Sequence, residues 1–193
     1  MFTVDDEFFY ETEVKKSKFL TFIMPYHLSE QRLKELRNEH PKARHHVLCF
    51  RYMNEYAQIV EYGSDDGEPK GCAGKPSLNV LRGSELVNCA TITVRYFGGI
   101  KLGTGGMVRA YSKAIQNVVA HAKLKDFVIK THLIISLNYS HGNQVSYFLE
   151  QEDIHIQDKV FKDQTIEMTL EATEEQKALL KQYSLETLLI TLK

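Results

Sequence analysis

The sequence has few cysteines and no long apolar run. Its three cysteines, Cys49, Cys72 and Cys89, are widely spaced and include no C-x-x-C pair, which argues against a disulfide framework and against a zinc site. No stretch reaches the roughly 18 consecutive apolar residues of a membrane helix. The opening segment FTVDDEFFYETE is acidic where a signal peptide is basic and then apolar. We therefore expect a cytoplasmic protein that does not contact membranes and carries neither a metal nor a cofactor.

The charge is divided unevenly along the chain. Of the 193 residues, 43% are hydrophobic and 25% are charged, as in ordinary globular proteins, and the formal net charge is −1. Residues 69–131 carry 10 Lys and Arg against 2 Asp and Glu, whereas residues 132–193 carry 5 against 10. Such an asymmetry indicates either an anionic partner for the basic segment or pairing of that segment with acidic residues of the same fold.

The last third of the chain has a regular pattern. Apolar or alternating segments at 133–139, 154–160, 165–172 and 187–193 predict strands, and residues 143–151 predict a helix. Thr173 opens a Thr-x-x-Gln capping box, which predicts a second helix. The order β-α-β-β-α-β is that of a ferredoxin-like domain. We place this domain at residues 131–193, after a first domain of residues 1–130, and assign the chain to the α+β class.

The first domain alternates strands and helices less regularly. SKFLTFIMPY, HHVLCFRYM, AQIVEYG and NCATITVRYF predict strands. Ser29 is predicted to cap a helix that runs to Glu39, and a short helix is predicted after Gly74-Lys75-Pro76. A long helix is predicted from Gly105 to Lys123, with its apolar positions on one face: Met107, Tyr111, Ala114, Ile115, Val118 and Ala122.

A glycine-rich basic loop, RYFGGIKLGTGGMVRAYSKA, precedes the long helix. Glycines between a strand and a helix allow backbone N–H groups to converge at the positive end of the helix dipole, which is an arrangement that binds phosphates. The sequence lacks the Gly-Lys-Ser/Thr of a P-loop. The alternative is that the glycines only form tight turns and that the cations are solvated. The candidate anion- or RNA-binding residues are Arg95, Gly98, Gly99, Lys101, Gly103, Gly105, Gly106, Arg109 and Lys113, with Lys75 at the start of the short helix.

An acidic loop, YGSDDGEPKG, lies upstream of the basic one. Asp65, Asp66 and Glu68 are oxygen ligands of the kind that a magnesium site uses, but Asp-Gly and Glu-Pro are also turn signals. The carboxylates could instead pair with Arg95 or Lys101 and hold the basic loop. His45 and His46 follow one another in a strand and point to opposite faces, so we do not expect them to bind one metal together. His46 is either a structural histidine or a metal-binding or acid–base group beside the acidic loop.

Three blocks of the sequence resemble the signature blocks of the IMPACT family, whose bacterial members are the YigZ-type proteins. These blocks are ARHHVLCF, SDDGEPKGCAGKPSLNVL and VRYFGGIKLGTGGMVRAYSKA, with KKSKFL as a weaker fourth. The resemblance implies a first domain like domain IV of elongation factor G and a second like its domain V, and hence contact with RNA or the ribosome. Eukaryotic members regulate translation through an additional N-terminal interaction domain, which we do not expect here.

These observations lead to one function and two alternatives. The leading hypothesis is a non-enzymatic, RNA- or ribosome-associated protein, a regulator of translation, that binds phosphate groups through the basic loop. Few aromatic residues accompany this loop beyond Tyr96, Phe97 and Tyr111, so we expect limited base stacking and sequence readout. The first alternative is a metal- or phosphate-dependent hydrolase that uses His46, Asp65, Asp66 and Glu68. The second is a protein-interaction adaptor, for which the acidic C-terminal domain is the candidate surface. No residue is assigned a catalytic role.

Overall fold

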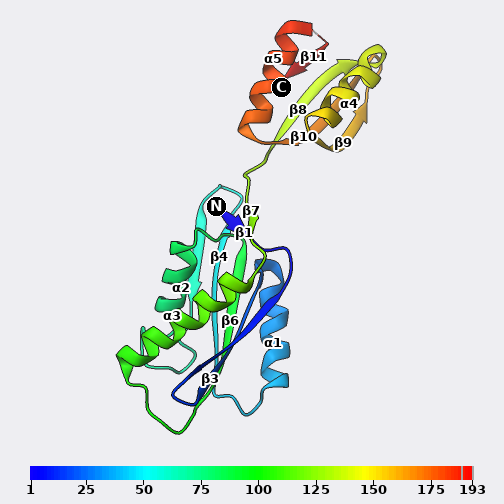
Figure 1. Ribbon diagram of the computed structural model, residues 1–193. Coiled ribbons are helices and arrows are strands. Elements are labelled where there is room, and N and C mark those ends of the chain that lie inside the picture. Colours follow the sequence, from blue (N-terminus) through cyan, green and yellow to red (C-terminus); the bar gives the residue numbers. More distant parts are fainter. Residues whose placement is uncertain (188, 193) are drawn as a thin grey trace. The chain divides into compact units, whose positions relative to one another are not determined.

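The protein consists of two compact units, Met1–Phe127 and Val128–Lys193. The structure is a computed structural model, and it describes residues 1–187 and 189–192 (Figure 1). Both units combine helices with antiparallel sheets, which confirms the predicted α+β class. Within the described residues, we find no helix of the length and apolar character that crossing a membrane requires.

The first unit is built on a five-stranded antiparallel sheet with the order β2-β3-β6-β4-β5. Four of these strands lie where the sequence predicts them: β3 (Ser17–Pro25), β4 (His45–Met53), β5 (Ile59–Gly63) and β6 (Cys89–Tyr96). The edge strand β2 (Phe8–Val14) was not predicted. Only Thr12 in it is buried, so β2 lacks the apolar alternation that marks a half-buried strand.

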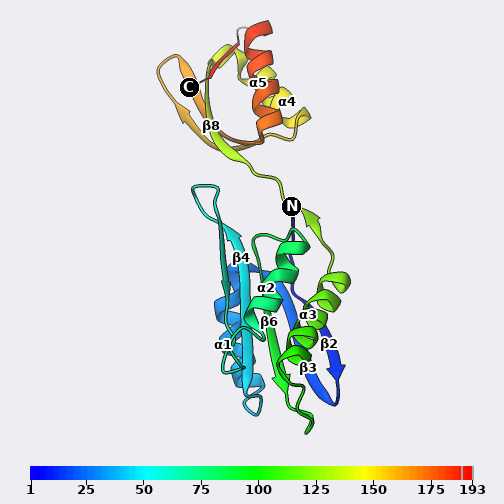
Figure 2. The same cartoon turned by 90° about the vertical axis from the view of Figure 1, so that its left-hand side faces the viewer.

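Helices cover both faces of this sheet (Figures 1 and 2). Helix α1 (Ser29–Glu39) packs on one face, where the buried core includes Phe22, Leu36 and Ile92. Helices α2 (Gly74–Gly83) and α3 (Thr104–His121) pack on the other, over a larger core. Because both faces are covered, the central strand β6 is buried along almost its whole length.

The long helix α3 has the predicted apolar face. Five of the six predicted inner residues are buried, and Ala122 lies just after the last helical residue, His121. The prediction for α1 was wrong at its first residue. Ser29 is the first residue of the helix rather than its cap, and its hydroxyl donates to the Tyr26 carbonyl at 2.7 Å in the preceding 3-10 turn η1 (Tyr26–Leu28). A short pair, β1 (Phe2–Thr3) and β7 (Lys125–Asp126), joins the two ends of the unit.

The second unit follows the predicted β-α-β-β-α-β order. Its sheet has the antiparallel order β11-β8-β10-β9. Thr173 and Gln176 form the predicted capping box, since each backbone N–H donates to the other's side chain, at 2.9 and 3.1 Å. Leu188 and Lys193, which belong to the last predicted strand, lie outside the described residues. The elements are β8 (Thr131–Asn138), η2 (Tyr139–His141), α4 (Gly142–Gln151), β9 (His155–Phe161), β10 (Thr165–Ala172), α5 (Glu174–Thr187) and β11 (Ile190–Leu192).

Candidate functional site

The antiparallel sheet brings three separate segments to the end where the glycine-rich loop lies. Strand β6 ends at Tyr96, β4 begins at His45, and the β2–β3 hairpin turns at Lys15 and Lys16. The register pairs Arg95 with both Phe19 and His45, so these segments are neighbours in space. The loop 97–103 then leads into α3. Cations that are far apart in the sequence therefore gather at this end of the first unit.

Two basic clefts flank the glycine-rich loop. The larger, of about 580 Å³, is lined by Lys42, Arg44, His45, Arg95, Tyr96, Phe97 and Lys101. The smaller, of about 300 Å³, is lined by Val14, Lys15, Leu102, Gly106, Arg109, Ala110 and Lys113. Neither lining includes a carboxylate. We call six of the lining cations the basic end: Lys15, Lys42, Arg44, Lys101, Arg109 and Lys113.

The side chains of the basic end are exposed. Across residues 1–187 and 189–192, none of the six takes part in an ion pair or a side-chain hydrogen bond. This end of the unit therefore carries positive charge that no neighbouring acid neutralises. Lys101, Arg109 and Lys113 were predicted site residues, whereas Lys15, Lys42 and Arg44 were not.

The N-terminus of α3 is open. Its N-cap residue Gly103 has a φ of 71°, a left-handed value that favours glycine; no side chain caps the helix, and its first turn holds no acidic residue. A Cβ added at Gly105 would meet no atom within 4 Å. Free amides, a positive helix end and open space thus coincide beside Lys101 and Arg109.

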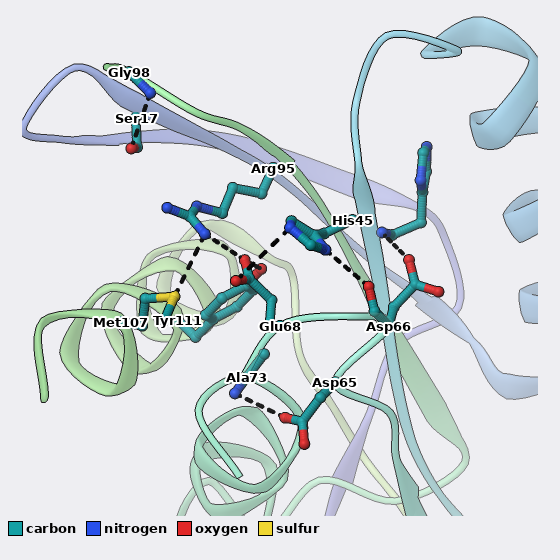
Figure 3. Close-up of polar contacts among 11 residues, drawn as sticks. Ser17, His45, Asp65, Asp66, Glu68, Ala73, Arg95, Gly98, Met107 and Tyr111 are labelled. Atoms are coloured by element: carbon teal, nitrogen blue, oxygen red, sulfur yellow. Dashed lines mark hydrogen bonds and ion pairs between the residues drawn. The ribbon is translucent and has the colours of Figure 1, made fainter. Parts of the chain in front are cut away.

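The N-terminus of α2 is closed by the protein's own carboxylate. Asp65 accepts a backbone N–H bond from Ala73 at 2.9 Å (Figure 3). It accepts two more, from Gly71 at 2.7 Å and from Gly74 at 2.9 Å. Burial acts to raise the pKa of Asp65, but these three donors hold it below its ordinary value. Lys75 lines a different cleft, between α2 and α3. The structure therefore does not bring Lys75 to the glycine-rich loop.

The glycines of the loop have different structural roles. Gly98 packs against the β2–β3 hairpin so closely that an added Cβ would lie 2.0 Å from the Lys16 carbonyl carbon. Its N–H donates to Ser17 Oγ at 3.2 Å. Gly99 has a φ of 83°, and a Cβ at Gly106 would touch only the Leu102 side chain, at 3.2 Å. Gly98 is thus a packing glycine, whose amide already has an acceptor.

A buried ionic network lies beneath the loop (Figure 3). Arg95 donates from one terminal nitrogen to Glu68 Oε1 at 2.6 Å, and the Tyr111 hydroxyl donates to the same oxygen at 2.8 Å. The side chains of Arg95 and Glu68 are only 8% and 3% exposed. Burial and the neighbouring Glu68 carboxylate raise the pKa of Tyr111, which keeps its phenol protonated. The predicted pairing of the acidic loop with Arg95 is confirmed, and it neutralises the Arg95 charge inside the fold.

The two histidines lie on opposite faces of β4, as expected. His45 lines the larger cleft, its Nδ1 is 2.8 Å from the Asp66 carbonyl oxygen, and its Nε2 is 3.8 Å from Glu68 Oε2. His46 is buried, and burial is the main reason why its pKa lies below the ordinary value. Its backbone N–H donates to the Asp66 carboxylate at 2.6 Å, which Arg37 also contacts at 3.3 Å.

The residues of the predicted hydrolase site are not assembled around one point. Asp65 caps α2, Asp66 joins the start of β4 to α1, and Glu68 pairs with Arg95. In the part of the chain that the structure describes, no group of three or more His, Cys, Asp or Glu side chains is placed to hold a metal ion. The three carboxylates thus act as links within the fold, and the backbone N–H of His46 is bound by one of them, that of Asp66.

Comparison with known proteins gives consistent results. Residues 15–119 match the model of the Impact N-terminal domain. An IMPACT family member from Haemophilus influenzae is 36% identical over 157 residues, which cover 79% of this chain and 76% of the relative. YigZ from Escherichia coli is 34% identical over 73% of this chain and 71% of its own length. A crystal structure of a hypothetical protein matches with a TM-score of 0.68 and 27% identity, over 99% of this chain and 95% of the other.

Proposed function

This chain belongs to the IMPACT family, and from that premise we propose that its first unit binds RNA through the basic end. The observation that carries the proposal is the pair of cation-lined clefts without carboxylates on either side of an open helix N-terminus. Phosphate groups are the ligands that such a surface attracts most strongly, because each contact releases counterions from the RNA. The resemblance to domains IV and V of elongation factor G favours RNA of the ribosome, and with it a role in regulating translation.

The second unit supports this reading indirectly. Its element order and sheet order are those of a ferredoxin-like fold, as the likeness to domain V of elongation factor G implies. The acidic composition of residues 132–193 disfavours a nucleic-acid surface there. We assign RNA contact to the first unit, and to the second unit a protein partner.

No specific observation favours either alternative function, the hydrolase or the protein-interaction adaptor. The carboxylates that a hydrolase would use are engaged by Arg95, by Arg37 and by backbone N–H groups. A function as an adaptor that binds only protein does not explain why unpaired cations surround a helix N-terminus. Co-sedimentation with ribosomes at low and high salt separates RNA binding from a purely protein-binding role.

Affinity for RNA as a function of salt tests the proposal directly. With about six phosphate contacts to a single strand, the logarithm of the association constant should fall with the logarithm of salt concentration at a slope of about −4. Replacing Lys42, Arg44 and Lys101 together by alanine should reduce the slope to about −2 and weaken binding at low salt.

A matched control removes the same charge elsewhere. Lys70, Lys75 and Lys123 are exposed and do not line either basic cleft. Replacing these three by alanine should leave the slope close to that of the wild type. Equal losses in the two triple variants would mean that net charge, rather than the basic end, determines binding, and the proposal would be wrong.

A further inference from the structure

We infer that the basic end takes single-stranded RNA and that Phe97 stacks on one of its bases. This inference rests on the proposed function and specifies its substrate class. Phe97 is the first residue after β6, its side chain is 58% exposed, and it lines the larger cleft together with Lys42, Arg44 and Lys101. An exposed aromatic ring surrounded by cations is the combination with which proteins hold unpaired nucleotides.

The backbone on both sides of Phe97 is fixed. On one side, the Tyr96 hydroxyl is 2.9 Å from His40 Nδ1, and the two rings meet edge to face. On the other side, Gly98 is held by Ser17 Oγ and packs against the Lys16 backbone. The ring of Phe97 is therefore presented on a rigid support, which lowers the entropy lost when a base stacks on it.

The ring of Phe97 makes no aromatic contact within the part of the chain that the structure describes. Among residues 1–187 and 189–192, Phe97 takes part in none of the aromatic or cation–π contacts, whereas Phe19 and Tyr111 meet edge to face in the core. A side chain that served only packing would lie in that core. Because Phe97 is 58% exposed, a planar group from outside can reach its ring.

Single strands fit this arrangement and duplexes do not. In an RNA duplex both faces of each base are stacked on neighbours, so no base can meet the Phe97 ring without being unstacked. Unpaired bases have accessible faces, and their phosphates can contact the lysines of the same cleft. Inorganic phosphate, which has no base, would contact the cations alone.

The test uses a fluorescent substitution at the site itself. The sequence contains no tryptophan, so Phe97→Trp introduces a single reporter whose emission a stacked base should quench. We expect quenching by a single-stranded RNA of about ten nucleotides, and little quenching by the matching duplex or by inorganic phosphate at the same phosphate concentration. In anisotropy measurements, Phe97→Ala should weaken single-strand binding about 5- to 150-fold with the salt slope unchanged.

Two further variants separate stacking from other losses. Phe97→Leu keeps an apolar side chain but no ring, so it should bind as weakly as Phe97→Ala. Tyr56→Ala removes an aromatic side chain that is 73% exposed in the β4–β5 hairpin, at the opposite end of the sheet, and it should bind like the wild type.

The outcomes are distinguishable. If the wild type binds single strands and duplexes equally, or if Phe97→Ala binds as well as the wild type, base stacking is refuted while RNA binding by the basic end stands. If Phe97→Leu binds like the wild type, apolar contact replaces stacking and the inference is also wrong. If the wild type binds no RNA at low salt, the proposed function itself fails.

Discussion

Replacing Glu68 by alanine should destabilise the first unit more than any single exposed charge does. The Glu68 carboxylate is 3% exposed and lies 2.6 Å from Arg95 and 2.8 Å from the Tyr111 hydroxyl. Its removal leaves the guanidinium of Arg95 buried without a counter-charge. Breaking a buried pair in this way costs about 3–5 kcal/mol, which is a fifth or more of the roughly 5–15 kcal/mol that stabilises a typical domain.

Differential scanning calorimetry of the full chain measures this loss. For a domain of this size, 1 kcal/mol corresponds to about 3–5 °C in the unfolding midpoint. The transition of the first unit should therefore move down by about 10–25 °C. The matched control is Glu30→Ala, because Glu30 forms an ion pair with Lys34 of similar length, 2.8 Å, but the two side chains are 84% and 72% exposed. Solvent screens that pair, so the midpoint should hardly move.

A double variant tests whether the unpaired charge is the cause. Glu68→Gln keeps an acceptor for Tyr111 but leaves Arg95 unpaired, and adding Arg95→Met removes that charge while keeping much of the side-chain volume. The double variant should therefore unfold at a higher temperature than Glu68→Gln alone. Our reasoning is refuted if Glu68→Ala costs no more than Glu30→Ala, or if the added Arg95→Met lowers the midpoint further.

Three other predictions follow from backbone contacts, each measured by urea denaturation. Gly98→Ala should lose about 1–3 kcal/mol because its Cβ would lie 2.0 Å from the Lys16 carbonyl carbon, whereas Gly105→Ala, with open space around it, should be neutral or gain up to about 1 kcal/mol. Because the pKa of Asp65 is lowered in the folded state, its carboxylate stabilises the fold above about pH 4, and this stabilisation is lost as the pH falls through the folded-state pKa. The free energy of unfolding of Asp65→Ala should therefore differ most from that of the wild type near neutral pH and approach it in acid. Thr173→Ala should cost the second unit about 0.5–2 kcal/mol by removing the capping box.

The elements with a strong local signal could be predicted from the sequence. Three such signals are the apolar stripe of α3, the capping box at Thr173 and the apolar runs of β3 and β6. Each is formed by residues that are close together in the sequence, so it can be recognised without knowledge of the fold. Strand β2 has no such signal. It is an edge strand, and its pairing with β3 is determined by the hairpin turn at Lys15 and Lys16, both of which have a left-handed φ.

The site could be predicted only in part, because its residues come from distant segments. The position of the glycine-rich loop could be predicted from its composition. Lys42 and Arg44 belong to the turn between α1 and β4, and they reach the same cleft only because β4 pairs with β6. No local pattern in the sequence predicts the pairing of β4 with β6. Phe97 is one of the few aromatic residues beside the basic loop, and their small number predicts limited base stacking. The exposure of its ring could not be predicted, since exposure depends on which neighbours pack around it.

The positions of the carboxylates explain why the charge asymmetry of the sequence allowed two interpretations. Pairing within the fold accounts for some of the positive groups, and other cations have no acidic partner among the described residues. Arg95 lies against an acidic residue of the same fold, Glu68, and Asp65 occupies the N-terminus of α2. Lys101 and Arg109 have no such acid, and the N-terminus of α3 has no cap. The internal acids thus neutralise Arg95 and the N-terminus of α2, and they do not neutralise the cations that face solvent beside α3. We therefore expect an external anion to bind at the N-terminus of α3 rather than at that of α2.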